Sequence, residues 1–416
     1  MIHLYNIGIL IYTLAVRLAS PFSEKARLWI RGRKGWEQVL KAGVDPSGVN
    51  LWFHCASLGE FEQGRPVMEE LKKKRPECKI ILTFFSPSGY EIRKKYAGAD
   101  FICYLPADTP RNARKFISAI NPSAVFFVKY EFWKNFILET RRQDVPLYLI
   151  SGIFRPGQHF FKWYGGFFRK MLFSFTHIFV QDADSERLLK ETGLQNVTVA
   201  GDTRFDRVVQ IAGAVREIPQ IRLFRGHEKL FLTGSSWPPD EEIIVKYLKS
   251  HPGTMKWVFA PHEIGSGNIE RLLKLTGEGT VRFSAFTEKD KDARVMIIDN
   301  IGMLSSAYRY ADIAAVGGGF GKGIHNVLEA ACWGIPVLFG PNHIKFREAL
   351  MLKAEGAAKS FSSYADFETA VDGWLSDDGS CEKAALKAGE YVRSNAGATE
   401  RILEKAGIKD MNNHFS

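Results

Sequence analysis

The 416-residue chain has few cysteines, and no two of them are close enough in sequence to form a C-x-x-C pair. The five cysteines are Cys55, Cys78, Cys103, Cys332 and Cys381. An odd number at wide spacing argues against a disulfide framework and against a cysteine-based zinc site. The composition therefore favours a protein of a reducing compartment.

The sequence also lacks internal repeats, low-complexity tracts and any apolar run of spanning length beyond Ile2–Ala19. That run is interrupted by His3, Asn6 and Arg17, and a helical span needs about 20 apolar residues. Its positive charges follow the run, whereas those of a secretory signal peptide precede it. We expect an uncleaved membrane anchor with a single helix and a cytoplasmic C-terminal side. A buried N-terminal helix is the alternative.

Acidic residues are outnumbered, since 56 Lys and Arg face 46 Asp and Glu, for a net charge of +10. Residues 17–41 hold half of this excess, with seven cations against two acids. A basic balance suits nucleic acid, anionic lipid or phosphorylated substrates. Because the basic segment follows the apolar run, we favour an anionic membrane surface and expect no nucleic-acid partner.

A second segment, Gln158–Phe175, interleaves aromatic side chains with Lys162, Arg169 and Lys170. Aromatic and basic residues together suit an anionic membrane interface, although they also suit stacked single-stranded nucleic acid. An amphipathic helix whose aromatic side chains belong to the core is the alternative. The preceding apolar run favours the membrane.

Short apolar runs alternate with amphipathic segments along the rest of the chain, which predicts parallel sheets covered by helices. The strands expected first are Val49–His54, Lys79–Thr83, Phe101–Tyr104, Ala124–Val128, Leu147–Ser151 and His177–Gln181. A second series comprises Lys229–Thr233, Trp257–Ala260, Val295–Ile298, Ile313–Val316 and Pro336–Phe339. The break between the two series, near Gly201–Gln220, predicts two domains, as the length also does.

The segment Val316–Pro341 has the pattern strand, glycine loop, helix and strand. Glycines allow positive φ and close backbone approach, and the start of a helix favours phosphate. The helix is expected to open near His325 and Asn326, with Glu329 placed to take ribose hydroxyls. A plain βαβ crossover whose glycines serve packing is the alternative.

This segment resembles the donor-nucleotide signature of GT-B glycosyltransferases, which have two Rossmann-like domains. Together with further blocks between Leu51 and Phe346, the chain resembles the family of 3-deoxy-D-manno-octulosonic acid (Kdo) transferases. The blocks are WFHCASLGEFEQGRPV, LTFFSPSGYE, YLPADTPRNARKFISAINPSAVFFVKYEFWKN, GDTRFDRV, GSSWPPDEE, APHE and the glycine segment.

The resemblance implies an α/β GT-B protein with an N-terminal membrane-anchor helix. Residues 1–20 would be the anchor, 21–205 an acceptor-binding Rossmann-like domain and 206–393 a donor-binding one. Residues 394–416 would form a C-terminal helix that packs back on the first domain, followed by a polar tail. The implied reaction transfers Kdo from CMP-Kdo to a lipid A precursor at the cytoplasmic face of the inner membrane, with inversion and with neither metal nor cofactor. The number of Kdo units transferred is left open.

The resemblance assigns the general base to Glu60, which follows the first expected strand at the start of a helix. An acid that merely favours a helix N-terminus is the alternative, and Glu62 is the rival carboxylate. The acceptor-side candidates are Ser86, Ser88, Glu131 and Arg155. At Lys129 other members often carry an acid, so the local charge pattern departs from the family.

On the donor side, candidate side chains and glycines follow the strands of the second domain. They are Ser235, Ser236, His262, Gly318, Gly319, Gly321, Gly323, His325, Asn326, Glu329 and Lys345. Many members have an arginine beside the histidine of APHE, and this chain lacks it. His262, with Lys322 or Lys345, would then neutralise the charge of the donor phosphate. The alternative is that the two lysines are ordinary surface charges.

Two other functions remain open from the sequence. One is another GT-B transferase, or an epimerase, that uses a UDP-sugar; HCASLGE and the apolar N-terminus argue against the epimerase. The other is a non-catalytic membrane adaptor that binds a nucleotide, against which an intact Glu60 argues.

Overall fold

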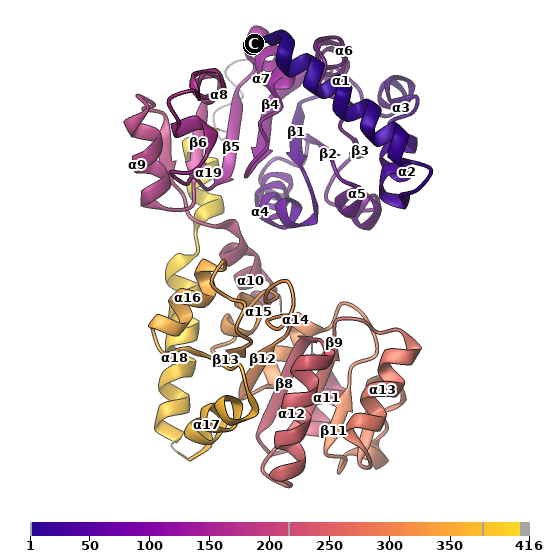
Figure 1. The fold of residues 1–416 in the computed structure, drawn as a ribbon, viewed down its shortest axis with the longest axis vertical. Helices are drawn as coiled ribbons and strands as arrows, with labels where there is room; N and C mark the ends of the chain where they lie inside the picture. The colour runs from indigo at the N-terminus through magenta and orange to yellow at the C-terminus, as the bar shows by residue number, and fades with distance from the viewer. Residues whose placement is uncertain (1, 215–216, 377, 408–416) are drawn as a thin grey trace. The chain divides into compact units, whose positions relative to one another are not determined.

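The chain divides into two α/β units, each built on a seven-stranded parallel sheet (Figure 1). The computed structural model describes residues 2–214, 217–376 and 378–407. Unit 1 combines the chain up to Arg207 with the segment from Ala396, and unit 2 is Val208–Asn395. Two Rossmann-like parallel-sheet domains were predicted, and this part of the fold class is confirmed. The predicted polar tail, Lys409–Ser416, lies outside the described residues.

The sheet of unit 1 has the strand order β3-β2-β1-β4-β5-β6-β7. Its strands are β1 Asn50–Cys55, β2 Lys79–Phe84, β3 Phe101–Tyr104, β4 Pro122–Val128, β5 Leu147–Gly152, β6 His177–Val180 and β7 Val197–Val199. The first six were expected within two residues at each end. Strand β7 was missed because two of its three side chains are only half-buried and one of these is a threonine, so no apolar run marks it.

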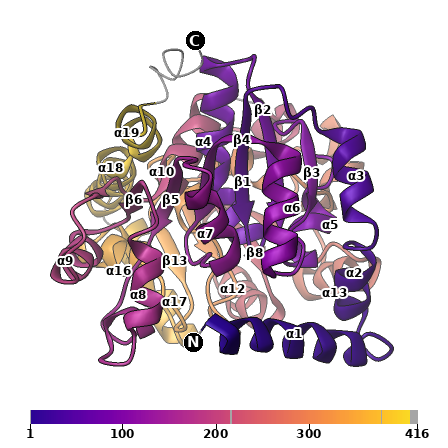
Figure 2. The same ribbon diagram turned by 90° about the horizontal axis from the view of Figure 1, so that it is seen from above.

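Helices cover both faces of this sheet (Figure 2). They are α1 Ile2–Ala19, α2 Glu24–Arg31, α3 Trp36–Gly43, α4 Leu58–Lys74, α5 Pro87–Arg93, α6 Pro110–Ile120, α7 Lys134–Arg142, α8 Gly166–Leu172, α9 Ala183–Glu191 and α19 Ala398–Lys405. Along β1, Trp52 joins one hydrophobic core while Leu51 and Phe53 join the other. Successive strand side chains point to opposite faces, so a strand covered on both faces is apolar throughout.

The C-terminal helix α19 completes the second of these cores. Its Ile402 and Leu403 are buried with the side chains of β1, β2 and β4. The Tyr148 hydroxyl donates to the Ala406 carbonyl at 3.0 Å, and the Asp206 carboxylate accepts from the backbone N–H of Thr399 at 2.6 Å. The chain therefore returns to unit 1 after unit 2.

The sheet of unit 2 has the order β10-β11-β9-β8-β12-β13-β14. Its strands are β8 Leu230–Ser236, β9 Lys256–Pro261, β10 Thr280–Arg282, β11 Val295–Ile297, β12 Ile313–Val316, β13 Val337–Phe339 and β14 Ala358–Ser360. Its larger helices are α11 Pro219–Arg225, α12 Pro238–Ser250, α13 Ser266–Thr276, α16 Arg347–Ala354, α17 Tyr364–Leu375 and α18 Asp378–Asn395, and α10 Thr203–Gly213 crosses the boundary. The sequence missed β10 and β14, both of three residues.

Helix α1 packs along unit 1 instead of standing apart from it. The Tyr5 hydroxyl donates to the buried Asp108 carboxylate at 2.5 Å, and the Asn135 side chain donates to Asn6 at 3.0 Å. Farther along, the Tyr12 ring stacks on Phe85 at 6.1 Å between centroids. The polar and aromatic face of α1 therefore lies against the loops that follow β2, β3 and β4.

The membrane-spanning anchor predicted for residues 2–19 is not found. None of the helices in the described part of the chain is long and apolar enough to cross a membrane. The physical reason lies in the sequence, where polar side chains interrupt the 18-residue helix and serve as its contacts with unit 1. A buried N-terminal helix, the alternative, is not found either, because none of the described side chains of α1 is buried.

Candidate active site

Glu60 lies in the first turn of α4, directly beyond the carboxyl end of β1. Ser57, the residue before the helix, donates its hydroxyl to the Glu60 carboxylate. The carboxylate is half-buried, whereas that of the rival Glu62 pairs with Arg93 at 2.7 Å. Glu60 has no ion-pair partner among the described residues, and so its oxygens remain able to accept a proton.

Behind Glu60, the end of the sheet holds a buried polar network around His54. Its Nε2 lies 2.8 Å from Glu131 Oε2, and its Nδ1 lies 2.9 Å from the Thr83 hydroxyl. The Trp133 indole N–H also donates to Glu131. A carboxylate accepts only, so an Nε2–H of His54 donates to Glu131, while Nδ1 and the Thr83 hydroxyl form the second contact. The network fixes Glu131, which is 7% exposed, beside the candidate base.

The predicted acceptor-side serines follow the neighbouring strand. Ser86 caps α5, where its hydroxyl accepts from the backbone N–H of Ser88 at 3.3 Å, and the two hydroxyls lie 3.0 Å apart. The Ser86 N–H donates to the Ala56 carbonyl at 2.8 Å, which joins this turn to the one that carries Glu60. Ser88 is exposed at the same edge of the sheet.

Tyr130 marks where the remaining acceptor-side groups meet. Burial raises the pKa of its hydroxyl; Arg155 lowers this pKa, while Glu60 and Asp182 raise it. Arg155 is exposed in the loop after β5, and its backbone N–H donates to the Gln158 side chain at 3.1 Å. Glu60, Glu131 and Arg155 each follow the carboxyl end of a strand, β1, β4 and β5, which are neighbours in the sheet of unit 1. Ligand sites of parallel sheets lie at this edge.

In unit 2 the glycine segment forms a tight loop after β12. A Cβ on Gly319 would lie 2.5 Å from the Gly340 Cα, and one on Gly317 would lie 2.3 Å from the Ser235 carbonyl oxygen. Gly318 and Gly323 have positive φ, at +91° and +144°. Two of these glycines therefore serve backbone packing, which was the alternative reading, while a Cβ on Gly321 would meet its nearest neighbour, the Gly318 carbonyl oxygen, at 3.6 Å.

The helix predicted after this loop is one turn long. Helix α15 covers Leu328–Ala331 and begins three residues later than expected. A single turn aligns few peptide dipoles, so α15 adds little dipole to the phosphate site predicted at its start. Glu329 is held by the Ser305 hydroxyl at 2.5 Å and by the Asn326 side chain at 3.2 Å.

An aromatic stack that the sequence did not predict stands at the carboxyl ends of β8 and β9. The His262 ring stacks on Trp237 at 4.8 Å and on His325 at 4.5 Å, and the Trp237 indole N–H donates to His325 Nε2 at 3.1 Å. Burial lowers the pKa of His325, and His262 lowers it further. The buried Asp240 carboxylate accepts from the Gly318 N–H at 3.1 Å, joining the stack's helix to the glycine loop.

The other donor-side candidates differ in their surroundings. The Ser236 hydroxyl is buried and donates to Glu241 at 2.7 Å, whereas Ser235 is half-buried with φ of +51°. Lys345 is exposed, without an ion-pair partner among the described residues. The block GSSWPPDEE already contained Trp237 and Asp240, but only the fold brings them to His262 and His325.

Three comparisons agree with this architecture. A family model described as "3-Deoxy-D-manno-octulosonic-acid transferase (kdotransferase)" matches residues 26–207. The 3-deoxy-D-manno-octulosonic acid transferase of Aquifex aeolicus is 29% identical over 333 residues, covering 78% of this chain and 86% of that protein. The one of Bordetella pertussis is 26% identical over 433 residues, covering 95% of this chain and 97% of that protein.

Solved structures show the same fold. A UDP-GlcNAc 2-epimerase from Neisseria meningitidis superposes with a TM-score of 0.61 at 17% identity, covering 87% of this chain and all of the other. MurG from Acinetobacter baumannii gives 0.53 at 14%, covering 86% and 98%. At such identities the likeness concerns the fold alone. The sequence relatives, which are similar over most of the chain, support the family of 3-deoxy-D-manno-octulosonic acid transferases.

Proposed function

We propose that this protein is an inverting glycosyltransferase that transfers Kdo from CMP-Kdo to a phosphorylated lipid A precursor in lipopolysaccharide core synthesis. The named activity of its relatives supports the sugar and the reaction class. The observation that carries the chemistry is the Glu60 carboxylate at the carboxyl edge of unit 1, which accepts from Ser57 and has no ion-pair partner in the part of the chain that the structure describes.

In this mechanism an acceptor hydroxyl oxygen attacks the anomeric carbon of Kdo, and the bond from that carbon to the CMP phosphate oxygen breaks. Attack on the face opposite the leaving group inverts the centre. Glu60 accepts the hydroxyl proton as the new bond forms, which is general-base catalysis. Ser57 orients the carboxylate by donating its hydroxyl to it.

We assign the acceptor to unit 1 and the donor to unit 2. In unit 1, Ser88 and Arg155 are exposed near Glu60 and can contact a sugar hydroxyl or a phosphate. In unit 2, the exposed Lys345 beside the glycine loop offers a cation to the CMP phosphate. Glu329, already ordered by Ser305, would accept from the ribose hydroxyls.

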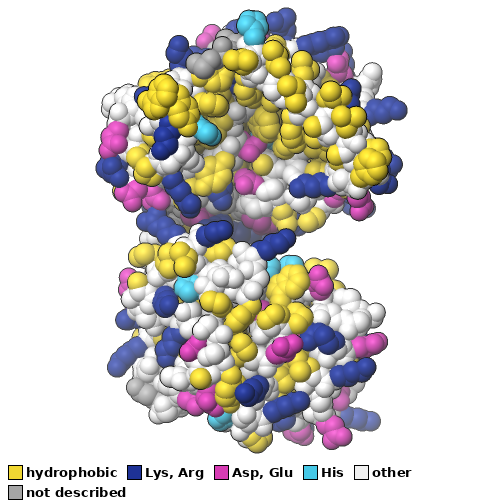
Figure 3. Space-filling model, viewed as in Figure 1, with side chains coloured by type: hydrophobic (Ala, Val, Ile, Leu, Met, Phe, Trp, Pro, Cys, Tyr) yellow, Lys and Arg dark blue, Asp and Glu magenta, His cyan; other side chains and the backbone are white. Residues whose placement is uncertain are grey.

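We place the protein flat on the cytoplasmic face of the inner membrane. The face of α1 that points away from unit 1 is a continuous apolar stripe, 50–70% exposed, of Leu4, Ile7, Leu10, Ile11, Leu14 and Leu18. Trp163, which is 93% exposed, and Tyr164 lie just before α8, whose Phe167 contacts Tyr5 of α1. Hydrophobic side chains gather over these elements (Figure 3). Such a helix lies in the plane of a membrane interface.

The activity is tested by supplying CMP-Kdo or UDP-GlcNAc with a phosphorylated tetraacyl disaccharide and following the glycolipid by mass spectrometry. We expect the product to gain Kdo only when CMP-Kdo is supplied. Transfer from UDP-GlcNAc, with none from CMP-Kdo, would favour the UDP-sugar alternative. Absence of any transfer, with intact CMP binding, would favour the adaptor.

The membrane location is tested with the triple variant Ile7→Gln, Ile11→Gln and Leu14→Gln. We expect it to leave the membrane fraction at lower salt than the wild type, because only electrostatic attraction remains. The matched control replaces equally exposed apolar residues elsewhere, namely Ile92, Ile301 and Leu386. Equal release of both variants would remove α1 from the membrane contact.

A further inference from the structure

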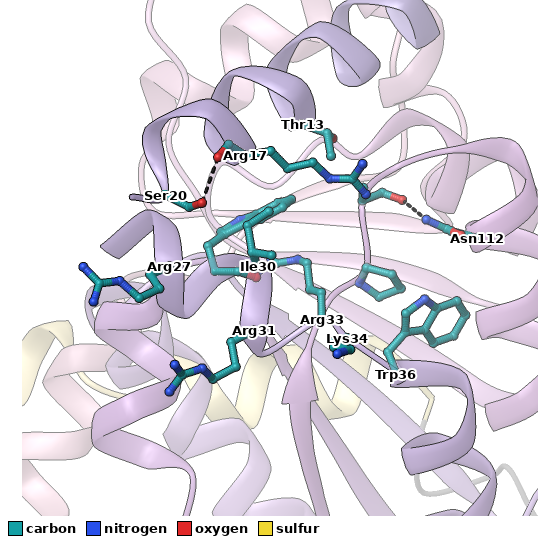
Figure 4. A pocket seen from close by; sticks show the side chains of 13 residues that line it. Thr13, Arg17, Ser20, Arg27, Ile30, Arg31, Arg33, Lys34, Trp36 and Asn112 are labelled. Carbon is teal, nitrogen blue, oxygen red and sulfur yellow. Dashed lines mark hydrogen bonds between the residues drawn. The ribbon is translucent and has the colours of Figure 1, made fainter. Parts of the chain in front are cut away.

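The basic segment at residues 17–41 folds around a pocket of about 580 Å³ in unit 1 (Figure 4). Five cations line it and no acidic residue does. Arg17 comes from α1, Arg27 and Arg31 from α2, and Arg33 and Lys34 from the turn that follows. The pocket thus gathers positive charge from three consecutive elements, and none of these cations belongs to the candidate active site.

These charges are not neutralised within the protein. Among the described residues, no carboxylate forms an ion pair with Arg17, Arg27, Arg31 or Lys34, and all four are exposed. Arg17 reaches over the pocket from α1, while Arg27 and Arg31 extend outward from α2 (Figure 4). The pocket therefore presents a strong positive potential to an incoming anion.

Arg33 forms the floor and is 9% exposed. Its guanidinium donates only to carbonyl oxygens, those of Leu105 at 2.7 Å, Phe85 at 2.8 Å and Trp29 at 3.1 Å. Burial lowers the pKa of Arg33 to about 9, which leaves it protonated at neutral pH. Because Leu105 and Phe85 directly follow β3 and β2, the charge is fixed to the sheet.

The pocket lies on the inner side of the same helix that carries the apolar stripe. Thr13, Arg17 and Ser20 line it, while Leu14 and Leu18 are exposed on the outer side of α1. The Thr13 and Ser20 hydroxyls are already used by backbone carbonyls, so the cations are the groups that remain for a ligand. A group bound in this pocket would lie next to the helix that we propose to contact the membrane.

We propose that this pocket binds the phosphate group of a membrane lipid. Arginine guanidinium groups donate two parallel N–H bonds to a phosphate, and the exposed Leu14 and Leu18 of α1 offer apolar surface to acyl chains. The phosphate has two sources, a bilayer phospholipid or the acceptor glycolipid itself. Binding of a bilayer phospholipid goes beyond the proposed transfer reaction, whereas binding of the acceptor glycolipid rests on it.

The test measures vesicle binding by flotation, without CMP-Kdo, using the full chain. The pocket variant carries Arg17→Gln, Arg27→Gln and Arg31→Gln. The matched control carries Lys73→Gln, Lys95→Gln and Lys190→Gln, which remove the same charge from exposed sites of unit 1. Vesicles consist of phosphatidylcholine alone, of phosphatidylcholine with phosphatidylglycerol, or of phosphatidylcholine with the phosphorylated acceptor at equal surface charge.

We expect the pocket variant to bind anionic vesicles about tenfold or more weakly than the control variant, with no difference on phosphatidylcholine. A larger loss on phosphatidylglycerol identifies the phospholipid, and a larger loss on the acceptor vesicles identifies the acceptor phosphate. Equal weakening of both variants on both anionic vesicles would overturn the proposal. Failure of Kdo transfer leaves these measurements unaffected, since no donor is present.

A second variant keeps the test decisive if the triple substitution unfolds the protein. Arg17→Lys with Arg31→Lys retains both charges but loses the planar guanidinium fork. A phosphate pocket predicts weaker binding to anionic vesicles than for the wild type. Unchanged binding would show diffuse attraction and would equally overturn the proposal.

Discussion

The carboxyl edges of the two sheets are built differently, although the sheets have the same number of strands. In unit 1 the edge consists of charged side chains, with Glu60 in front and the Glu131–His54 pair buried behind it. In unit 2 it consists of backbone in close contact, Gly319 against Gly340, and of the stack formed by Trp237, His262 and His325. The carboxyl edge of unit 1 therefore presents charged side chains, and that of unit 2 presents a closely packed backbone loop and aromatic rings.

This difference matches the demands of the proposed reaction. A carboxylate that acts as a general base needs an oxygen able to accept a proton. Buried neighbouring side chains keep such a carboxylate in position. A nucleotide sugar is instead bound through many weak contacts, for which a rigid backbone loop and flat rings are suited. The comparison predicts that chemical steps respond to charge changes in unit 1, and that binding and stability respond to shape changes in unit 2.

The largest effect is expected for Glu60→Gln, which keeps the side-chain shape and removes the proton acceptor. Transfer should fall by about 10²- to 10⁴-fold, measured as the initial rate with saturating donor. CMP affinity by calorimetry and the melting temperature should stay near wild type, because the CMP contacts are assigned to unit 2.

Glu62→Gln is the control for this prediction. The Glu62 carboxylate forms an ion pair with Arg93, so we do not assign it the role of base and expect its variant to stay active. A Glu60→Gln protein that turns over at the wild-type rate would make Glu60 a helix-start acid only. The base would then have to be sought at Glu131 or Glu62.

The next effect concerns shape in unit 2. Gly319→Ala places a Cβ 2.5 Å from the Gly340 Cα, a backbone atom that cannot rotate away. Such overpacking should cost unit 2 about 1–3 kcal/mol in unfolding free energy, measured by denaturant titration. Gly321→Ala is the matched control, since its nearest neighbour would lie at 3.6 Å. Equal stability of the two variants would contradict the role of the Gly319–Gly340 contact.

A moderate effect is expected for Glu329→Ala. Removing the carboxylate leaves ribose hydroxyls unpaired and should weaken CMP binding by roughly 1–3 kcal/mol. Calorimetry with CMP and with UMP measures the change, and the wild-type protein should prefer CMP to UMP and UDP. Unchanged affinity would remove Glu329 from the ribose site and leave it as the partner of Ser305.

The smallest effect is a pH dependence from the stack. The folded-state pKa of His325 lies below its ordinary value of 6.5 because of burial and then His262. Between these two pKa values the unfolded chain binds more protons, so stability is full above pH 6.5 and is lost as the pH falls toward the lowered value. The difference in melting temperature between wild type and His325→Gln should therefore shrink on acidification. A constant difference would contradict this linkage.

Most of the architecture could be predicted from the sequence because buried strands and amphipathic helices leave strong periodic signals. Strands β7, β10 and β14 could not, since their side chains are mostly half-buried and partly polar, whereas the equally short β11 and β13 are fully buried and apolar. The helix after the glycine loop was overestimated because its residues are good helix formers. In the structure, backbone bonds such as His325 N–H to the Gly317 carbonyl hold this segment in a loop instead.

The candidate site was harder to predict than the fold. Glu60, Glu131 and Arg155 were identified as strand-end residues, and such residues meet at one edge by topology. The basic pocket and the stack of Trp237 with two histidines depend on which loops touch, which no local pattern encodes. For α1 the composition suggested a membrane span. The hydrogen-bond partners of Tyr5 and Asn6, which hold the helix on unit 1, could not be predicted because they are distant in sequence.

The return of α19 to unit 1 has a consequence for how the protein is made. Unit 2 occupies one uninterrupted stretch of the chain, so all of its residues are synthesised before Ile402 and Leu403. Unit 1 begins first but can close its second hydrophobic core only after these two residues have followed the whole of unit 2. The unit encoded later is therefore able to reach its native state earlier, and any premature stop before residue 398 leaves unit 1 with an open apolar groove for chaperones and proteases to recognise.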